Sequence, residues 1–366
     1  MRIAIVHYTA PPVIGGVERV VGEQARVLAD RGYEVDLVCG PCDEVMGRLG
    51  NAGAHYDAII VHNVFTMPFD LKLTAALRDM AAARPDIRFI NWVHDVAAAN
   101  PNYVHLPWDQ ADVQMLKQPP EAVHVAVSEV RKFEYLAMTG LPEDQCRIIP
   151  NGVDVAGILG LTERVNRLVE ELRLWDRDYV LFHPTRVLRR KNIELGLRVV
   201  HALRDLSLDV AYLITGAPDA HQPDGAVYGA ELRATIEELG LQDSAFFLGE
   251  STSLSNDDVR SLYAISDALL FPSKAEGFGL PVVEAGLHGV PVFCSDIPAH
   301  REVGQCIASY FDLDEDPALI AHGITTHPVV ETRYVRRMTL AGWLDWPRIC
   351  VAHIEPLLNV EPTTSS

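Results

Sequence analysis

The sequence has few cysteines and no long apolar run, and each shortage excludes a class of protein. Six cysteines in 366 residues are too few and too scattered for the disulfide framework of a small secreted protein. No stretch approaches the roughly eighteen consecutive apolar residues of a membrane-spanning helix. The start, "MRIAIVHYTAPP", lacks the basic residues and apolar stretch of a signal peptide. We therefore expect a cytoplasmic protein.

Basic residues are also scarce. The chain has 31 Lys and Arg against 50 Asp and Glu, for a formal net charge of -19. A surface that follows nucleic-acid phosphates needs clustered Lys and Arg, so we expect no nucleic-acid partner. Residues 1–150 hold 13 basic and 19 acidic residues, which also disfavours binding to an anionic membrane.

One pair of cysteines has the spacing of a redox site. "CGPC", Cys39 to Cys42, follows an apolar strand, as thioredoxin-like motifs do. However, Val38 stands where such motifs usually carry an aromatic residue, and the chain is far longer than that fold. We interpret the pair as small residues at the end of a strand, with a redox centre as the alternative.

Short β-branched runs alternate with helical patterns, which predicts an α/β fold. "RIAIVHY", "EVDLV", "DAIIVH" and "RFINWVH" are separated by helix-length or turn segments, and the alternation restarts at "YVLFHPTR" after a turn at Pro150-Asn151-Gly152. A chain of this length usually exceeds one core. We therefore predict two Rossmann-like, doubly wound domains with mostly parallel sheets.

The domain boundaries follow from the turn and the looser charged stretch after it. A final amphipathic pattern begins at an Asp345 cap. The predicted segments are an N-terminal domain over 1–154, a linker over 155–178, a C-terminal domain over 179–335, a helix over about 342–360 that packs back on the first domain, and a disordered tail over 361–366.

The stretch "DALLFPSKAEGFGLPVVEAGLHGVPVF" joins a strand, a glycine turn and a helix. Gly277 and Gly279 let the backbone approach a ligand, and Pro281 suits the first turn of the helix. In a doubly wound sheet this turn faces the ligand crevice, and the free N–H groups there favour an anion such as a diphosphate. Glu276 and Glu284 flank this turn. Two carboxylates around a phosphate nest suit a sugar nucleotide; a solvated loop and helix face is the alternative.

Two further motifs place polar groups at strand ends. "HPTRVLRRKN" puts Arg186 and Lys191 on a short loop, where both can neutralise the charge of a departing nucleoside diphosphate. Ordinary surface charge is the alternative for this pair. Arg189 and Arg190, which lie between them, are expected to face solvent.

The second motif, "NWVHD", ends a strand with His94. Asp95 could orient the His94 ring, and a purely structural histidine is the alternative.

These segments together resemble the retaining GT-B glycosyltransferases of family four. "IGGVERVVGEQARVLADRGYEVDLV", "IIPNGVD" and "SDALLFPSKAEGFGLPVVEAGLHGVPVFCSD" carry the resemblance, which covers nearly the whole chain. It implies a GT-B fold, in which two Rossmann-like domains face a central cleft, with the acceptor on the N-terminal side and the donor on the C-terminal side. It implies retaining transfer of a hexosyl group from a nucleoside diphosphate sugar, UDP- or GDP-linked, to a hydroxyl acceptor.

The resemblance also implies roles for individual residues. The implied catalytic residues are His94, Arg186, Lys191 and Glu276. The implied donor-binding residues are Gly15, Gly16, Phe278, Gly279, Leu280 and Glu284. Family members use the Arg and Lys in place of a metal, and no Asp-x-Asp motif occupies a matching position, so we expect neither a metal nor a cofactor.

The sequence leaves the acceptor and the nucleobase open. The acidic N-terminal half favours a soluble metabolite or saccharide as acceptor. The stretches "GAPDAHQPDGAVYG" and "STSLSNDD" depart from the family pattern, the second near its nucleobase site, so neither base is predicted. A GT-B sugar-nucleotide epimerase and a non-catalytic sugar-nucleotide-binding protein are the alternatives. No oligomeric state is predicted.

Overall fold

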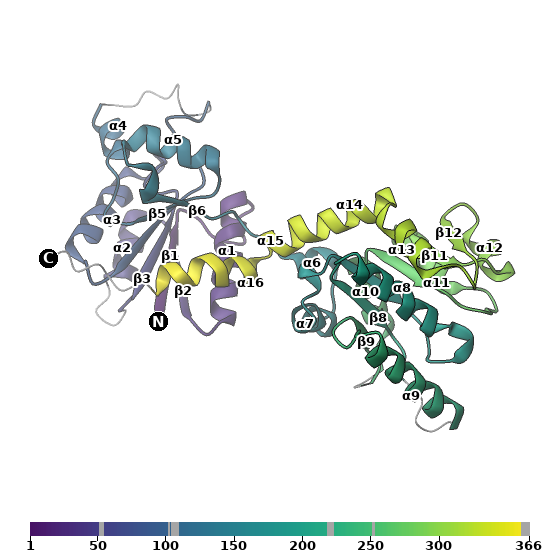
Figure 1. Cartoon of the computed structure of the whole chain (residues 1–366). Coiled ribbons are helices and arrows are strands. Elements are labelled where there is room, and N and C mark those ends of the chain that lie inside the picture. The colour runs from purple at the N-terminus through teal and green to yellow at the C-terminus, as the bar shows by residue number, and fades with distance from the viewer. Residues whose placement is uncertain (51–54, 102, 104–109, 218–222, 251–252, 360–366) are drawn as a thin grey trace. The chain divides into compact units, whose positions relative to one another are not determined.

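The chain folds into two compact units. The computed structural model describes residues 1–50, 55–101, 103, 110–217, 223–250 and 253–359. Unit 1 comprises Met1–Asp154 and the C-terminal segment from Leu344, and unit 2 comprises Val155–Trp343. Each unit has a six-stranded sheet that lies between layers of helices (Figure 1). The two predicted Rossmann-like domains are thus confirmed, whereas the predicted tail over 361–366 lies outside the described residues.

Unit 1 has a parallel sheet in the order β2-β1-β3-β4-β5-β6. Alternate residues of each strand face opposite helix layers, as the two-residue period of a strand requires. Ile3 and Ile5 pack with α1 and the C-terminal segment, whereas Ala4 and Val6 pack with α2 and α3. The elements are β1 (Arg2–His7), α1 (Gly16–Asp30), β2 (Glu34–Cys39), α2 (Cys42–Leu49), β3 (Ala58–His62), α3 (Leu71–Ala83), β4 (Arg88–Val93), α4 (Gln110–Lys117), β5 (Val123–Ala126), α5 (Glu129–Thr139), η1 (Glu143–Gln145) and β6 (Cys146–Ile148).

The C-terminal segment completes the core of unit 1. It consists of α16 (Trp346–Ile349), η5 (Cys350–Ile354) and α17 (Glu355–Leu358), and it buries Trp346 and Ile354 against α1 and the sheet. Asp345 is its N-cap residue. Val153 N donates to Leu344 O at 2.7 Å, so the two stretches of chain that join the units are paired within unit 1.

Unit 2 has a parallel sheet in the order β12-β11-β10-β7-β8-β9. Its core packs α8, α9 and α13 against one face of the sheet. The elements are α6 (Val155–Leu159), α7 (Glu163–Glu171), η2 (Leu174–Asp176), β7 (Tyr179–His183), η3 (Arg189–Lys191), α8 (Ile193–Asp205), β8 (Val210–Ile214), α9 (Pro223–Glu238), β9 (Ala245–Phe247), α10 (Asn256–Ile265), β10 (Ala268–Phe271), α11 (Leu280–Leu287), β11 (Val292–Ser295), α12 (Pro298–Gly304), β12 (Ala308–Phe311), α13 (Pro317–Thr325), α14 (Pro328–Arg336), η4 (Arg337–Ala341) and α15 (Gly342–Leu344).

The segment 155–178, predicted as a linker, is helical and belongs to unit 2. Thr162 caps α7 through its side chain. The same hydroxyl donates to Asp258 Oδ1 at 2.6 Å, and Thr162 N donates to Ser261 Oγ at 3.0 Å. These bonds to α10 fix the segment on unit 2, which also extends beyond the predicted limit at 335 to Trp343.

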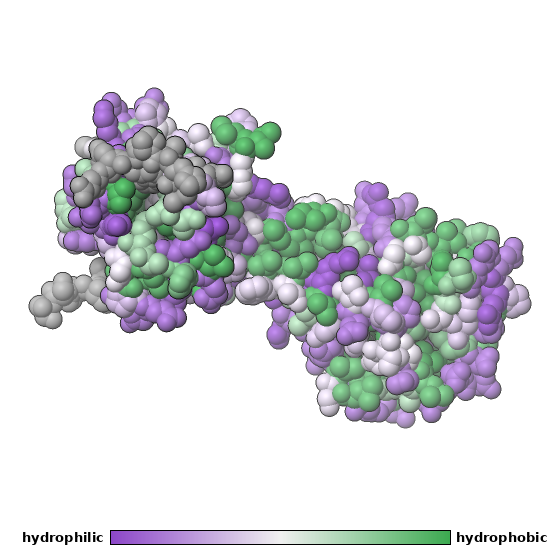
Figure 2. Space-filling view, turned by 90° about the horizontal axis from the view of Figure 1, so that it is seen from above, coloured by the Kyte–Doolittle hydropathy of each residue, from purple (hydrophilic) through white to green (hydrophobic). Residues whose placement is uncertain are grey.

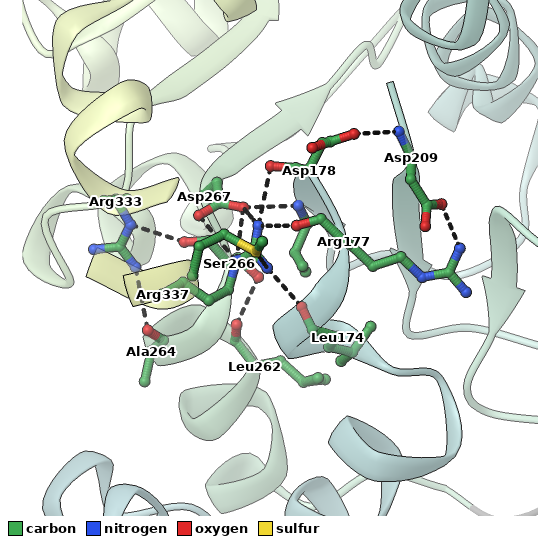
Figure 3. A network of polar contacts seen from close by, with 12 residues as sticks. Leu174, Arg177, Asp178, Asp209, Leu262, Ala264, Ser266, Asp267, Arg333 and Arg337 are labelled. Carbon is green, nitrogen blue, oxygen red and sulfur yellow. Dashed lines mark hydrogen bonds and ion pairs between the residues drawn. The ribbon is translucent and has the colours of Figure 1, made fainter. Parts of the chain in front are cut away.

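A buried arginine ties the ends of unit 2 together. Arg337 donates to Asp267 Oδ2 at 2.9 Å, and their side chains are 4% and 1% exposed. The guanidinium also donates to three backbone carbonyls, those of Leu174, Arg177 and Asp178, and Figure 3 shows it lying among them. A buried charge needs this degree of pairing, so the network fastens the chain before β7 to the segment after α14.

The surface is mixed in character. On the face seen in Figure 2, polar and apolar residues are interspersed over each unit. Among the described residues, no helix is both long enough and apolar enough to cross a membrane.

Candidate functional site

The predicted donor-side residues of unit 2 lie on loops that leave two neighbouring strands. β7 and β10 pair in parallel. From β7 the chain adds β8 and β9 on one side and then returns to place β10 on the other side. Ligands of open α/β sheets bind outside the carboxyl ends of the strands at such a reversal of strand order. Arg186 and Lys191 follow β7, and Glu276 follows β10, so the topology brings the two motifs to one place.

Lys191 and Glu276 form an ion pair across these loops. Lys191 Nζ donates to Glu276 Oε1 at 2.5 Å, and the two side chains are 10% and 8% exposed. The ammonium also lies 5.0 Å from the centre of the Phe271 ring. Lys191 is the last residue of η3, which is a single tight turn. From this position the Lys191 side chain extends from the loop after β7 toward the loop after β10.

Arg190 also reaches Glu276, although we expected it to face solvent. Its side chain is exposed, yet Nη1 lies 3.2 Å from Glu276 Oε2 and donates to Ala275 O at 2.9 Å. Arg189 does point away and pairs with Glu231 at 2.7 Å. The adjacent arginines thus differ, and only Arg190 adds a second cation to Glu276.

The ionisation of the pair follows from this arrangement. Burial opposes ionisation of Glu276, but the hydrogen bond and charge of Lys191, together with Arg190, outweigh it and lower the pKa of the carboxyl. Burial lowers the pKa of Lys191, which the bond to Glu276 partly restores, while Arg190 and Arg186 lower it further. Arg186 is therefore within electrostatic reach of Lys191. It is exposed, and it makes no ion pair with any described residue.

The backbone of Arg186 is positioned by close packing against Gly216. A Cβ on Gly216 would lie 2.5 Å from Thr185 O and 2.9 Å from Arg186 Cα, so only glycine fits between the loops after β7 and β8. Thr185 N donates to Thr215 Oγ1 at 2.8 Å, which joins the same loops. Part of the stretch "GAPDAHQPDGAVYG" is helical, because α9 begins at Pro223.

α11 begins with an open N-terminus beside Glu276. Its N-cap, Gly279, has φ 92°, in the left-handed region that favours glycine. No side chain caps this end. Within the described chain, the N–H groups of Phe278, Gly279 and Leu280 have no hydrogen-bond partner. Phe278 and Leu280 are exposed. Free N–H groups at the positive end of a helix can bind an anion such as a phosphate.

Glu284, on the exposed side of α11, is oriented by a tyrosine. The Tyr263 hydroxyl donates to Glu284 Oε2 at 2.9 Å, and Tyr263 itself is buried. Burial and the Glu284 charge raise the pKa of Tyr263, so the hydroxyl remains a donor. This contact fixes one oxygen of Glu284, while the other makes no hydrogen bond to any residue the structure describes and is available to a hydroxyl ligand.

His94, in unit 1, lies directly after β4 and is 8% exposed. Its Nε2 lies 2.8 Å from His62 Nδ1 and its Nδ1 lies 3.5 Å from Asn151 Nδ2. Asp95, expected to orient the ring, has its carboxylate 3.8 Å from Arg131 instead. The ring is therefore oriented by His62 and Asn151. Burial, with a smaller contribution from the His7 charge, lowers the pKa of His94 to about 3, so the imidazole is neutral.

Gly15 and Gly16, named by the resemblance as donor-binding residues, lie at the start of α1 in unit 1. Gly15 is the N-cap residue, and the Glu18 carboxylate lies where a Cβ on Gly15 would be. Thr9 Oγ1 donates to Glu18 Oε1 at 2.5 Å. The end of this helix is thus covered by a carboxylate from its own first turn, in contrast to the open end of α11.

The remaining candidate sites are weak. Burial raises the pKa of both Cys39 and Cys42, which is opposite to the activated thiolate of a redox centre. Within the described chain, no group of three or more His, Cys, Asp or Glu residues is arranged to hold a metal ion.

Sequence reasoning missed three residues that contact the predicted ones, and two of them had a usable signal. His62 ends a strand, just as His94 follows one, so its place at the same sheet edge could have been predicted. Arg190 precedes Lys191 in a motif that we had already singled out. Tyr263 had no signal, because only the folded packing of α10 against α11 brings it to Glu284.

Two family profiles match the chain. The profile described as "Glycosyltransferase Family 4" matches residues 14–156, and the profile described as "Glycosyl transferases group 1" matches residues 166–305. Between them they cover more than half of the sequence and fall on the two units in turn.

Individual relatives are more distant. The chain is 39% identical over 111 residues to a serotype-specific mannosyltransferase of Escherichia coli, a match that covers 30% of this chain and 14% of that protein. It is 24% identical over 263 residues to the mannosylglucosylglycerate synthase of Thermotoga maritima, covering 66% and 58%. The crystal structure of Anabaena HepE with UDP aligns over 98% of this chain and 100% of that one, with 18% identity and a TM-score of 0.39.

The first profile covers the Met1–Asp154 part of unit 1 from just before α1 to its end, and the second covers unit 2 from α7 to the end of α12. The chain is therefore a glycosyltransferase of the GT-B type, with the family 4 profile on its first unit and the group 1 profile on its second.

Proposed function

We propose that this chain is a retaining, metal-independent hexosyltransferase that moves a sugar from a nucleoside diphosphate sugar to a hydroxyl acceptor. The observation that carries the proposal is the buried Lys191–Glu276 pair beside the open N-terminus of α11. The Glu276 carboxylate can accept hydrogen bonds from sugar hydroxyls, and the N–H groups at the start of α11 can bind a phosphate. Together they suit a donor in which a sugar is attached to a phosphate.

Each donor-side group then has a defined task. The N–H groups of Phe278, Gly279 and Leu280 hold the diphosphate, and Glu284 accepts hydrogen bonds from the ribose. Glu276 binds hydroxyls of the sugar. Arg186 and Lys191 stabilise the negative charge that develops on the departing diphosphate, which is the task a divalent metal would otherwise perform.

The transfer step is proposed to occur on one face of the sugar. The acceptor oxygen forms its bond to the anomeric carbon on the side from which the diphosphate oxygen departs. That departing phosphate oxygen takes the acceptor proton, so no protein base is consumed. The family resemblance names three further site residues, His94, Gly15 and Gly16, which we propose contact the substrates during transfer.

The acceptor is proposed to be a small soluble molecule, and the sugar a hexose. The acidic residues 1–150 disfavour an anionic membrane surface. Two relatives support the choice through their names, one a mannosyltransferase and the other a synthase of mannosylglucosylglycerate. UDP and GDP are the two proposed carriers.

An activity screen tests the proposal. The purified chain is incubated with UDP- and GDP-hexoses, each with and without polyol, glycerate and saccharide acceptors, and the anomeric configuration of the product is read by NMR. We expect an acceptor-dependent product that keeps the donor configuration. An inverted product, or epimerised donor in the absence of any acceptor, would refute it.

Calorimetry with UDP and GDP tests the placement of the donor. Glu284→Ala should lose about 1–2 kcal/mol of diphosphate affinity, as for a hydrogen bond to a charged group. Glu276→Ala should lose little, because the diphosphate lacks the sugar. Glu237→Ala, which removes an exposed glutamate of α9, is the control and should bind normally. Equal losses in the two site variants would show that the donor is misplaced.

A further inference from the structure

Three neighbouring strands of unit 1 lead into histidines at the same edge of the sheet. His7 ends β1, His62 ends β3, and His94 directly follows β4. β1, β3 and β4 are adjacent and parallel, so the three rings lie at the carboxyl edge. All three are buried, and His62 has no role in the proposed function.

The rings of His62 and His94 belong to a line of hydrogen bonds. Gln24 Oε1 lies 2.9 Å from His62 Nε2, and His62 Nδ1 lies 2.8 Å from His94 Nε2. The two ring centres are 5.1 Å apart and the ring planes differ by 25°. The rings therefore meet nearly edge to edge, with the shared hydrogen close to both ring planes, which is good hydrogen-bond geometry.

This line determines which nitrogen of each ring carries the proton. Burial lowers the pKa of His62 well below its ordinary value, with the neighbouring His94 and His7 adding to the effect, so the ring is neutral. A neutral imidazole has one donor and one acceptor nitrogen. Because Gln24 Oε1 only accepts, His62 donates from Nε2 and accepts at Nδ1. His94 must then donate from Nε2, which leaves its Nδ1 as an acceptor.

The acceptor nitrogen of His94 faces a weakly held neighbour. Asn151 Nδ2 lies 3.5 Å from His94 Nδ1, which is at the long limit for a hydrogen bond. Asn151 is partly exposed. A ligand hydroxyl can therefore replace this amide as the donor to Nδ1 at little cost, whereas the bond from His94 Nε2 to His62 is short and buried.

The residue after His62 holds the backbone of His94. Asn63 Oδ1 accepts from His94 N at 2.7 Å and from Asp95 N at 3.1 Å. Asn63 has φ 61°, an uncommon conformation for a residue other than glycine. His7 Nδ1 in turn donates to His62 O at 2.9 Å. The pair His62-Asn63 thus fixes both the ring and the main chain of His94.

We propose that His62 is a positioning residue: with Gln24, it holds His94 as the Nε2–H tautomer, so that His94 Nδ1 accepts a hydrogen bond from a substrate hydroxyl during transfer. The proposal rests on the proposed function for the role of His94, but the tautomer itself is independent of any activity. If the side-chain amides of Gln24 and Asn151 were both rotated by 180°, exchanging their oxygen and nitrogen atoms, the donor and acceptor in each hydrogen bond of the line would be exchanged. His94 would then be the Nδ1–H tautomer, so a measurement of the tautomer tests the assignment directly.

The first test is NMR of the full chain labelled with 15N in histidine. Long-range proton–nitrogen correlations distinguish the two tautomers, and His94→Gln assigns the His94 signals. We expect His94 with its proton on Nε2 in the wild type. His62→Phe, which keeps a ring in the cavity, and Gln24→Met, which removes the acceptor, should each give a mixture of tautomers. A wild-type Nδ1–H tautomer, or an unchanged tautomer in both variants, would overturn the proposal.

The second test is kinetic. Loss of the fixed tautomer should lower kcat about tenfold or more in both variants while donor KM stays within about twofold, since a wrongly set imidazole costs far more in other enzymes. His124→Phe is the control, because His124 is another buried histidine of unit 1 that bonds to Tyr135 and not to this line. It should leave kcat and the His94 tautomer unchanged.

The two tests separate this inference from the proposed function. If the tautomer changes but kcat does not, the positioning role is refuted while donor binding and transfer stand. If the wild type transfers no sugar to any acceptor, the proposed function fails, and with it the part of this inference that concerns substrate. Should His62→Phe not fold, Gln24→Met alone decides both tests, because it does not alter either ring.

Discussion

Lys191 and Glu276 should act as one catalytic unit, and a double-mutant cycle can show it. The perturbations are Lys191→Met, Glu276→Gln and the two together. The pair is at 2.5 Å with both side chains about one-tenth exposed, so each residue holds the other in position. Removing Glu276 leaves the largely buried Lys191 free to move and without its counter-charge, whereas removing Lys191 leaves Glu276 with only the exposed Arg190 as a cation.

The size of the effect follows from that geometry. Loss of one preorganised stabiliser of developing charge typically costs about 10²-fold in kcat. Each single variant should therefore lose about 10²-fold. Independent residues would give about 10⁴-fold in the double variant, whereas residues that act as a unit are strongly non-additive. We expect the double variant to lose only about 10²- to 10³-fold.

Arg186 provides the matched comparison. It is exposed and makes no ion pair with any described residue, so its contribution does not depend on Glu276 for position. Arg186→Ala should also lose about 10²-fold in kcat, but combined with Glu276→Gln the losses should multiply. The assay is steady-state transfer at saturating donor and acceptor. Multiplicative losses for Lys191 with Glu276, or a wild-type kcat in any single variant, would refute this reasoning.

The other predictions concern metal, thiols and the buried arginine. Excess EDTA should leave transfer largely intact, and activity that returns only with Mg²⁺ or Mn²⁺ would contradict the role given to Arg186 and Lys191. Cys39→Ser with Cys42→Ser should keep wild-type transfer, and the wild type should not reduce insulin; a reductase activity lost in that double variant would restore the redox interpretation. Arg337→Met should lower the stability of unit 2 by about 3–5 kcal/mol, because it leaves a buried carboxylate unpaired; an unchanged urea midpoint for loss of tyrosine circular dichroism would count against that network.

The sequence predicted the architecture well because buried parallel strands have a strong signature. Each β-branched run lies within or close to a strand, and the second series restarts at Tyr179, where β7 begins. The prediction was wrong for 155–178, where the charged stretch after the turn suggested a linker. That segment still has a capping Thr162 and apolar residues at Val165 and Val169, one helical turn apart and both buried, which is enough for a short helix on the surface of a domain.

The site was predictable in part, for a different reason. Residues on the loops after β7 and β10 could be grouped, because a doubly wound sheet brings such loops together. The partners of those residues could not be predicted, because partners depend on side-chain direction. Arg190 and Arg189 are adjacent and chemically identical, yet one bonds to Glu276 and the other to Glu231. Only the tertiary packing decides between them.

The contact of Gly216 with the backbone of Arg186 limits how this enzyme can vary. Any side chain at position 216 would force apart the loops after β7 and β8, which contact each other through main-chain atoms. The Arg186 guanidinium would then be displaced, although no charge would change. Random mutagenesis scored by lost activity should therefore return position 216 among the essential sites, although it contacts no substrate.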